Sequence, residues 1–178
     1  DYNTAISLNR FDPEGFVRRS RIHIMQNNLQ EAIADLNSAI ALDTANTFAY
    51  FNRALAKYNN KEIMGALSDL DTVLMQDKNN ALSLYNRALI KSEIGDYNNA
   101  LEDYDKVLEI NPDNVLAYYN RASVFMQLGK FRDAINEQDN AIKLYPDFAN
   151  AYMNRSYGKN QLGQLKSAKR DYETAQAK

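Results

Sequence analysis

ALSLYNRALIKSEIGDYNNALEDYDKVLEINPDN, residues 81–114, recurs with variations on both sides of itself. Sliding the sequence by 34 residues lays this stretch over residues 47–80 before it and residues 115–148 after it, with matches at fixed offsets. A constant period of this length is typical of stacked helical hairpins, in which each unit packs only on its neighbours. The sequence therefore predicts a repeat array.

The period divides the chain into segments of one continuous solenoid domain. Residues 1–12 align with the second helix of a repeat, so we expect the chain to start within a truncated unit. Five units follow, with the ranges 13–46, 47–80, 81–114, 115–148 and 149–178. Because the ends of such an array are open, end-to-end self-association through the truncated repeats is one expected behaviour.

Each unit has the signals of two amphipathic helices, which we call the first and the second helix. In residues 81–114, Leu84 and Ala88 recur at helical spacing in the first half, and Ala100 and Val107 do so in the second. Three units have a glycine at the turn between the halves, where a positive φ is easiest for glycine: Gly95, Gly129 and Gly163. The pattern predicts helix, turn, helix in every unit.

Small residues occur at matching positions of the two predicted helices. The fourth position of the second helix is alanine in all five units: Ala32, Ala66, Ala100, Ala134 and Ala168. The first helix offers a small residue opposite it: Ser20, Ala54, Ala88, Ala122 and Ser156. Two small residues let two helix axes approach, so the sequence predicts close antiparallel pairs.

This set of positions resembles the tetratricopeptide repeat. Each unit has a large apolar residue four positions before the small residue of its first helix: Phe16, Tyr50, Leu84, Tyr118 and Tyr152. The resemblance covers the whole chain. It implies an all-α fold, a right-handed α-solenoid of antiparallel helix pairs, with the first helices lining a concave face. The chain departs from the family at the eleventh position, which is usually aromatic but here holds His23, Lys57, Lys91, Phe125 and Lys159.

The composition of the chain argues against several classes of function. The net charge of −2 gives no basic field for nucleic acid, so we expect no nucleic-acid partner. The absence of cysteine and the single histidine exclude a thiolate nucleophile and a Cys/His zinc site, and we predict no catalytic residue, no metal ligand and no cofactor. No apolar run approaches the length of a membrane span, so we expect no membrane insertion. The sequence does not indicate a compartment.

The first candidate site is a column of asparagines at the sixth position of four units: Asn52, Asn86, Asn120 and Asn154. An amide has donors and an acceptor, so it can pair with the backbone of an extended peptide. Some tetratricopeptide-repeat proteins, such as the O-linked N-acetylglucosamine transferases, hold polypeptide on an asparagine ladder that this column resembles. The alternative is that each asparagine braces neighbouring helices, and the sequence leaves both open.

The second candidate is an apolar stripe on the first helices, separate from the stripe that holds the small residues. Its inner members are Phe51, Tyr85 and Tyr119, followed by Leu55 and Leu89. If these aromatic rings remain open, they form an interaction surface. Phe48, Leu82 and Leu116 precede them by three residues and fit packing against the neighbouring repeat equally well.

The third feature is a charge register. Every full unit has an arginine at its seventh position: Arg19, Arg53, Arg87, Arg121 and Arg155. The twenty-third position is always acidic: Asp1, Asp35, Asp69, Asp103, Glu137 and Asp171. Because a buried unpaired charge costs several kcal/mol, we predict that each arginine pairs with an acid of this column, in its own unit or the preceding one, as structural ion pairs.

These features predict a non-enzymatic interaction module that binds an extended or helical polypeptide segment in its groove. The partner is a protein or peptide that the sequence does not identify. Two alternatives stay open: a structural spacer within a larger protein, and a substrate-recruiting domain of an enzyme whose catalytic part lies outside this chain.

Overall fold

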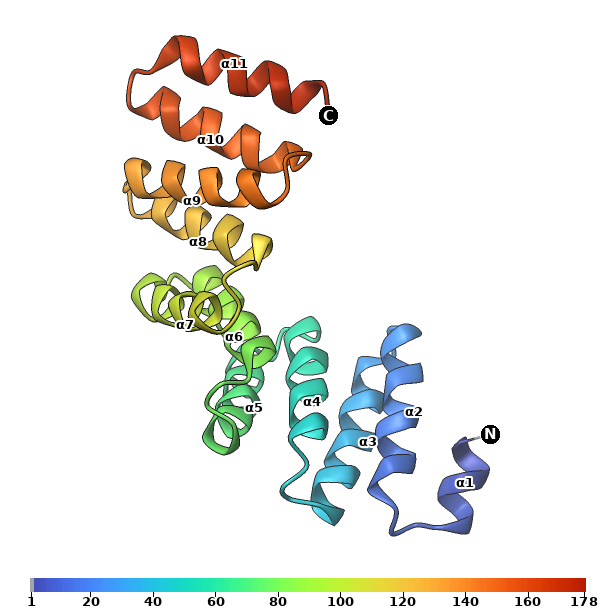
Figure 1. The fold of residues 1–178 in the computed structure, drawn as a ribbon. Coiled ribbons are helices and arrows are strands. Elements are labelled where there is room, and N and C mark those ends of the chain that lie inside the picture. The colour runs from blue at the N-terminus through green and yellow to red at the C-terminus, as the bar shows by residue number, and fades with distance from the viewer. Residues whose placement is uncertain (1) are drawn as a thin grey trace. The chain divides into compact units, whose positions relative to one another are not determined.

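Helices follow one another along the chain and are joined by short turns (Figure 1). The computed structural model describes residues 2–178, without the side chain of Ala5, so the expectation for Asp1 lies outside the described residues. In that described part the helices are α1 (Tyr2–Leu8), α2 (Pro13–Met25), α3 (Leu29–Leu42), α4 (Thr47–Asn59), α5 (Ile63–Gln76), α6 (Ala81–Glu93), α7 (Tyr97–Ile110), α8 (Val115–Gln127), α9 (Phe131–Leu144), α10 (Ala149–Gln161) and α11 (Leu165–Gln176). The all-α prediction is confirmed.

Side-chain caps begin several of the first helices. Asp12 accepts a hydrogen bond from the backbone N–H of Glu14 at 3.0 Å, and Pro13 fills the first helical position, where a missing N–H has no cost. Asn46 and Asn114 accept from backbone N–H groups three residues later, at 2.9 and 3.0 Å. The polar residue before each of these helices therefore sets where the helix begins.

A residue with positive φ closes the turn between the two helices of every full unit. Gly95, Gly129 and Gly163 have φ of 82°, 70° and 73°. Asn27 and Lys61 take the same conformation at 60° and 67°, although both have a Cβ. The turn geometry thus persists in the two units that lack glycine, at the cost of backbone strain.

The helices of a unit pack as antiparallel pairs through their small residues. Ala32, Ala66, Ala100 and Ala134 are fully buried, as are Ala54, Ala88 and Ala122 on the first helices. Ser156 on α10 is buried too and donates a hydrogen bond from its Oγ to the carbonyl of Ala168 on α11 at 2.7 Å. Close approach of the two helix axes is therefore achieved as the sequence predicts.

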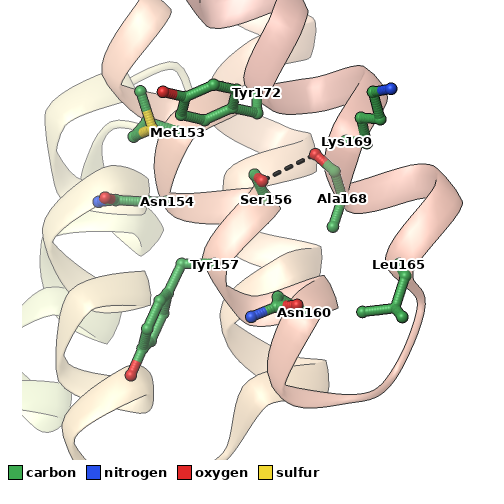
Figure 2. A pocket seen from close by; sticks show the side chains of 9 residues that line it. All are labelled: Met153, Asn154, Ser156, Tyr157, Asn160, Leu165, Ala168, Lys169 and Tyr172. Carbon is green, nitrogen blue, oxygen red and sulfur yellow. Dashed lines mark hydrogen bonds between the residues drawn. The ribbon is translucent and has the colours of Figure 1, made fainter.

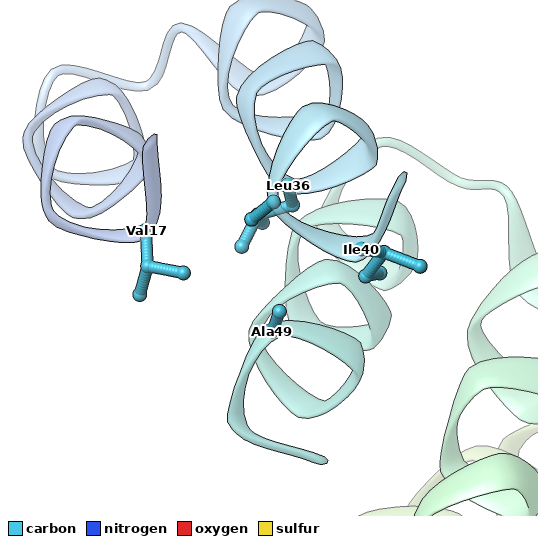
Figure 3. Packing of buried hydrophobic residues seen from close by; sticks show 5 residues of the cluster. Val17, Leu36, Ile40 and Ala49 are labelled. Carbon is cyan, nitrogen blue, oxygen red and sulfur yellow. The ribbon is translucent and has the colours of Figure 1, made fainter. Parts of the chain in front are cut away.

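The described helices form two compact units, Asp1–Ser83 and Leu84–Lys178. In Asp1–Ser83 a core cluster joins Val17 of α2, Leu36, Ala39 and Ile40 of α3, and Ala49 of α4 (Figure 3). Helices from two consecutive repeats therefore share this core.

In Leu84–Lys178, α10 packs closely on the preceding pair. A Cβ on Gly158 would lie 3.0 Å from Met126 Cε of α8 and 3.1 Å from Ile135 Cγ1 of α9. A side chain at position 158 would therefore require Met126 and Ile135 to shift by a few tenths of an ångström. Side chains of α8 and α9 therefore pack against α10, so consecutive repeats of this unit also contact each other directly.

Candidate functional site

The asparagine column does not form a set of equivalent amides. Asn52 on α4 donates to the carbonyl of Phe48 on its own helix at 2.7 Å. Asn120 on α8 donates from Nδ2 to the hydroxyl of Tyr85 on α6, also at 2.7 Å. Asn86 has an interaction partner within the protein as well, whereas Asn154 lines a depression on α10 and α11. Part of the column thus braces the protein itself.

The predicted inner aromatic residues are only half exposed. Tyr85 packs edge-on against Tyr104 with ring centroids 6.1 Å apart, and Tyr119 lies against Phe148 at 4.8 Å. Burial raises the pKa of Tyr85, and the hydrogen bond from Asn120 opposes that rise. Phe51, Leu55 and Leu89 are half-buried too.

Three members of the apolar stripe are exposed, namely those that precede the inner aromatic residues by three positions. Relative exposure is 51% for Phe48, 65% for Leu82 and 52% for Leu116. These residues hold the second position in three successive repeats, each on a first helix. The sequence left open whether neighbouring repeats would cover them, and the described contacts leave them at the surface.

Each arginine of the charge register contacts the acid of its own second helix. Arg53 reaches Asp69 with Nε at 2.8 Å and Nη2 at 2.6 Å, and Arg87 reaches Asp103 with the same two distances. Arg155 binds Asp171 in the same bidentate way at 2.8 and 2.7 Å. Arg19 and Arg121 contact their acids, Asp35 and Glu137, as close as 2.5 and 2.7 Å.

A third hydrogen bond from the arginine reaches the preceding repeat. Nη1 of Arg121 donates to Asp105 on α7 at 2.5 Å, and Nη1 of Arg155 donates to Asp139 on α9 at 2.6 Å. In Asp1–Ser83 the corresponding acceptor of Arg53 is Asn37 on α3, at 2.7 Å. One guanidinium therefore joins three helices.

The arginines also lie over aromatic rings. The guanidinium carbon is 5.2 Å from the ring centroid of Tyr50 for Arg53, and 5.2 Å from that of Tyr152 for Arg155. Arg121 lies 5.7 Å from the ring of Tyr118. Each ring is three residues before its arginine, so one turn of the first helix holds both partners.

Sequence reasoning missed a second cation at the same carboxylates. Lys57, Lys91 and Lys159 contact Asp69, Asp103 and Asp171 at 2.8, 2.7 and 2.7 Å. These lysines hold the eleventh position, where the family pattern has an aromatic residue. The signal in the sequence was the constant spacing of twelve residues between lysine and aspartate.

Two acids of the charge register have pKa values that are shifted in opposite directions. At Asp171, burial favours the neutral form, but hydrogen bonds from Arg155 and Lys159 outweigh it and lower the pKa below 3.8. The unit of Glu137 has Phe125 at the position that holds a lysine in the unit of Asp171. Burial there raises the pKa above 4.5, and Arg121 offsets only part of the rise.

An apolar depression lies on α10 and α11, and the sequence did not predict it. Figure 2 shows its lining: Met153, Asn154, Ser156, Tyr157, Asn160, Leu165, Ala168, Lys169 and Tyr172. Four of these are large apolar side chains with relative exposures of 40% (Met153), 55% (Tyr157), 63% (Leu165) and 45% (Tyr172). We call this surface the α10–α11 face.

Two other kinds of site are absent from the described residues 2–178. No group of three His, Cys, Asp or Glu side chains there is arranged to hold a metal ion. None of the described helices has the length and apolar character needed to cross a membrane.

Comparison with known proteins identifies the repeat. A family model described as TPR repeat matches residues 89–129, and one described as Tetratricopeptide repeat matches residues 115–148. No curated protein sequence matches the chain significantly.

Solved structures share the fold at low sequence identity. MamA from Desulfovibrio magneticus RS-1 superposes with a TM-score of 0.88 at 16% identity, covering 93% of each chain. YrrB, described as a TPR protein with an unusual peptide-binding site, has a TM-score of 0.82 at 17% identity, covering 98% of this chain and 90% of its own. These comparisons agree with the helix pairs: residues 89–148 match tetratricopeptide-repeat models, and the chain shares the fold of solved tetratricopeptide-repeat structures.

Proposed function

We propose that the chain is a non-enzymatic protein-interaction module that binds a polypeptide segment along its first helices. The observation that carries the proposal is the exposure of Phe48, Leu82 and Leu116 by half or more at one repeat position. Each of these side chains offers a partner apolar surface to bury, and each further anchor that a partner engages adds to its affinity.

The fold-level comparison supports the same class of function. YrrB is described as having a peptide-binding site and shares the fold at 17% identity. That likeness supports the class of partner, a peptide or protein, and does not bear on its sequence.

The asparagines have a secondary role in the proposal. Asn52 and Asn120 each donate one N–H within the protein, and an amide has a second N–H and a carbonyl oxygen to offer a peptide backbone. Each such bond contributes about 0.5–1.5 kcal/mol net, so the apolar contacts carry most of the affinity.

A phage-displayed library of short linear peptides tests the proposal. We expect the chain to enrich peptides whose affinity falls in Leu116→Ser, because that change removes an exposed apolar anchor from α8 without opening the core. Leu144→Ser is the matched control, since Leu144 is an exposed leucine on a second helix, α9. Failure to enrich any peptide, or equal loss in both variants, would contradict the proposal and favour the spacer alternative.

The role of the asparagines needs a separate variant. Asn120→Ala removes the bond to Tyr85 and is expected to lower the free energy of unfolding by about 0.5–1.5 kcal/mol. If the variant unfolds earlier but binds the enriched peptides with unchanged affinity, Asn120 is a brace and does not contact the peptide.

A further inference from the structure

A lysine that follows α11 contacts the loop between α9 and α10. Nζ of Lys178 donates to Oδ1 of Asp147 at 2.6 Å and lies 5.7 Å from the ring centroid of Tyr152. The hydrogen bond to Asp147 raises the pKa of Lys178, because the carboxylate favours the ammonium form. A carboxylate beside an aromatic ring thus binds an ammonium group at this loop.

The loop between α7 and α8 has the same carboxylate and ring. Asp113 and Tyr118 lie one repeat length before Asp147 and Tyr152. Each aspartate follows a proline in the loop after a second helix, and each tyrosine is on the next first helix. An arginine guanidinium lies over both rings, 5.7 Å from the centroid of Tyr118 and 5.2 Å from that of Tyr152.

The two loops also share one backbone conformation. The residue that ends the second helix has φ −133° and ψ 87° at Asn111, and φ −133° and ψ 89° at Tyr145. The residue before the first helix has φ −76° and ψ 90° at Asn114, and φ −78° and ψ 80° at Phe148. The earlier loop therefore presents its aspartate to the adjoining helices as the later loop does.

The chain supplies no lysine to Asp113. The residue one repeat length before Lys178 is Leu144, the last residue of α9, which is 38% exposed. Asp113 is exposed, and its carboxylate has no hydrogen bond or ion pair among the described residues. The same pair of groups thus occurs twice in this unit, once with a lysine of the chain and once without one.

Exposed apolar side chains border Asp113 and Leu144. Ile110, three residues before Asp113, is 42% exposed, and Tyr145, next to Leu144, is 52% exposed. A lysine can lay its methylene stem along such surface while its ammonium reaches the carboxylate. All four residues belong to the third and fourth full repeats, each of which has a repeat on both sides.

We propose that Asp113, Tyr118 and Leu144 form a docking site for a lysine of a partner protein, with apolar residues of the same partner segment beside it. Two observations select this occupant: the charge of Asp113, and the ammonium of Lys178 on the equivalent groups of the next repeat. An exposed ion pair alone contributes little, so the neighbouring apolar contacts are part of the site.

The docking site is separate from the surface that carries the proposed function. Leu116 and Tyr118 are two residues apart on α8, so their side chains leave the helix on nearly opposite sides. Leu116 is one of the exposed positions of the first helices, whereas Tyr118 is half-buried beside Arg121. A partner on Asp113 therefore leaves Leu116 accessible.

The test uses a synthetic tripeptide of leucine, lysine and leucine, acetylated and amidated at its ends. NMR spectra of the isotope-labelled full chain are expected to show saturable shifts in residues 113–118 and 144–145. Asp113→Asn is expected to weaken binding roughly threefold or more, because the ion pair is lost. Leu144→Lys is expected to abolish it, since a lysine of the chain then reaches Asp113.

Two further probes and one variant make the result specific. A tripeptide with norleucine in place of lysine keeps the stem but has no ammonium, and it is expected not to bind. The n-butylammonium ion has the ammonium without the leucines, and it is expected to bind more weakly than the tripeptide. Asp133→Asn is the matched control, because Asp133 is an exposed acid at the opposite end of α9. Circular dichroism confirms that each variant folds.

Any of five outcomes would overturn the inference. They are no saturable shift, unchanged affinity in Asp113→Asn, equal binding of the norleucine peptide, equal binding of n-butylammonium, and self-association in sedimentation that Asp113→Asn abolishes. The last would assign the site to a second copy of the chain. Failure here is distinguishable from failure of the proposed function, because that function is tested with Leu116→Ser and this site with Asp113→Asn.

Discussion

Gln138 places a polar side chain at a position that leucine fills elsewhere in the chain. It is fully buried, its Oε1 has no hydrogen-bond partner among the described residues, and its Nε2 lies 3.4 Å from the carbonyl of Tyr119. The earlier units have Leu36, Leu70 and Tyr104 buried at this repeat position. The α8–α9 pair thus carries a buried polar atom without a hydrogen-bond partner.

We predict that Gln138→Met raises the free energy of unfolding by about 1–2 kcal/mol, because the substitution keeps the side-chain volume and removes an unsatisfied carbonyl. Urea denaturation followed by circular dichroism measures the change. Gln127→Met, at an exposed position on α8, is the control and is expected to stay within about 0.5 kcal/mol. Lower stability in Gln138→Met would show that the long bond to Tyr119 matters more than the orphan oxygen.

Lys61 holds a conformation that three later units give to glycine. Its φ is 67°, and a left-handed conformation costs a residue with a Cβ roughly 1–2 kcal/mol. We predict that Lys61→Gly stabilises the chain by about 0.5–1 kcal/mol, the strain relieved less the entropy that glycine adds to the unfolded chain. The midpoint of thermal unfolding measures it, and Gly129→Ala is expected to shift the midpoint the opposite way. Equal shifts in one direction would contradict the strain argument.

For single residues, the sequence predicted which repeat position a residue holds better than it predicted which side chain that residue contacts. The turn glycines and the arginine column follow from the period alone, since residues at one repeat position share one environment. The hydrogen bond between Asn120 and Tyr85 links residues 35 apart on neighbouring first helices, and no repeat-position argument specifies how far each side chain reaches. The lysines that contact Asp69, Asp103 and Asp171 were missed because the family pattern has an aromatic residue, which forms no ion pair, at their position.

Between helices, the charge register makes two acids respond to pH in opposite ways. The folded state lowers the pKa of Asp171 and raises that of Glu137. Asp171 therefore contributes stability above its ordinary pKa of 3.8 and loses it as pH falls through the lowered pKa. Glu137 does the reverse, so the folded state gains stability as pH falls through its raised pKa towards 4.5.

We predict that the stability advantage of the unaltered chain over Asp171→Asn shrinks as pH falls below 3.8, because Asp171 is then protonated. Its stability relative to Glu137→Gln is expected to increase as pH falls towards 4.5. Urea denaturation over a pH series measures both differences. Trends of the same sign would show that Arg155 and Lys159 do not outweigh the burial of Asp171.

The helices themselves were predictable, but their exposure was not. Phe48 and Phe51 lie on one stripe of α4, three residues apart, and hydrophobic periodicity treats them alike. In Leu84–Lys178 the equivalent Tyr119 is partly covered by Phe148, which precedes α10. Coverage therefore depends on a residue between helices, which has no periodic signal.

In a repeat array each unit packs only on its neighbours, so we expect a destabilising substitution to affect only the helices near it. Ala122 is fully buried on α8, and replacing it with leucine overpacks the α8–α9 contact at a cost of about 1–3 kcal/mol. We predict that Ala122→Leu speeds amide hydrogen exchange in α8 and α9, while α2 and α3 keep their rates. Hydrogen exchange read by mass spectrometry measures this, with Gln127→Leu as the exposed control. Equal acceleration in all helices would mean that the chain unfolds as one cooperative body.

The sequence predicted the repeat count from the period, and the helix bounds follow that period. The division of the described chain into Asp1–Ser83 and Leu84–Lys178 has no counterpart in the sequence. The division falls within α6, which lies at the same place in the 34-residue period as α4 and α8. The period reflects only what the repeats have in common. It therefore does not indicate which junction between repeats differs from the others.

The arginine whose guanidinium contacts two further helices also bears on how repeats can be added to such a protein. Residues 115–148 supply a donor in Arg121 and an acceptor in Asp139, so the segment carries both halves of the junction. An in-frame duplication of that segment would supply both an arginine for the preceding repeat and an acid for the following one. Such a duplication would therefore keep the arginine–acid contact at the junctions it creates.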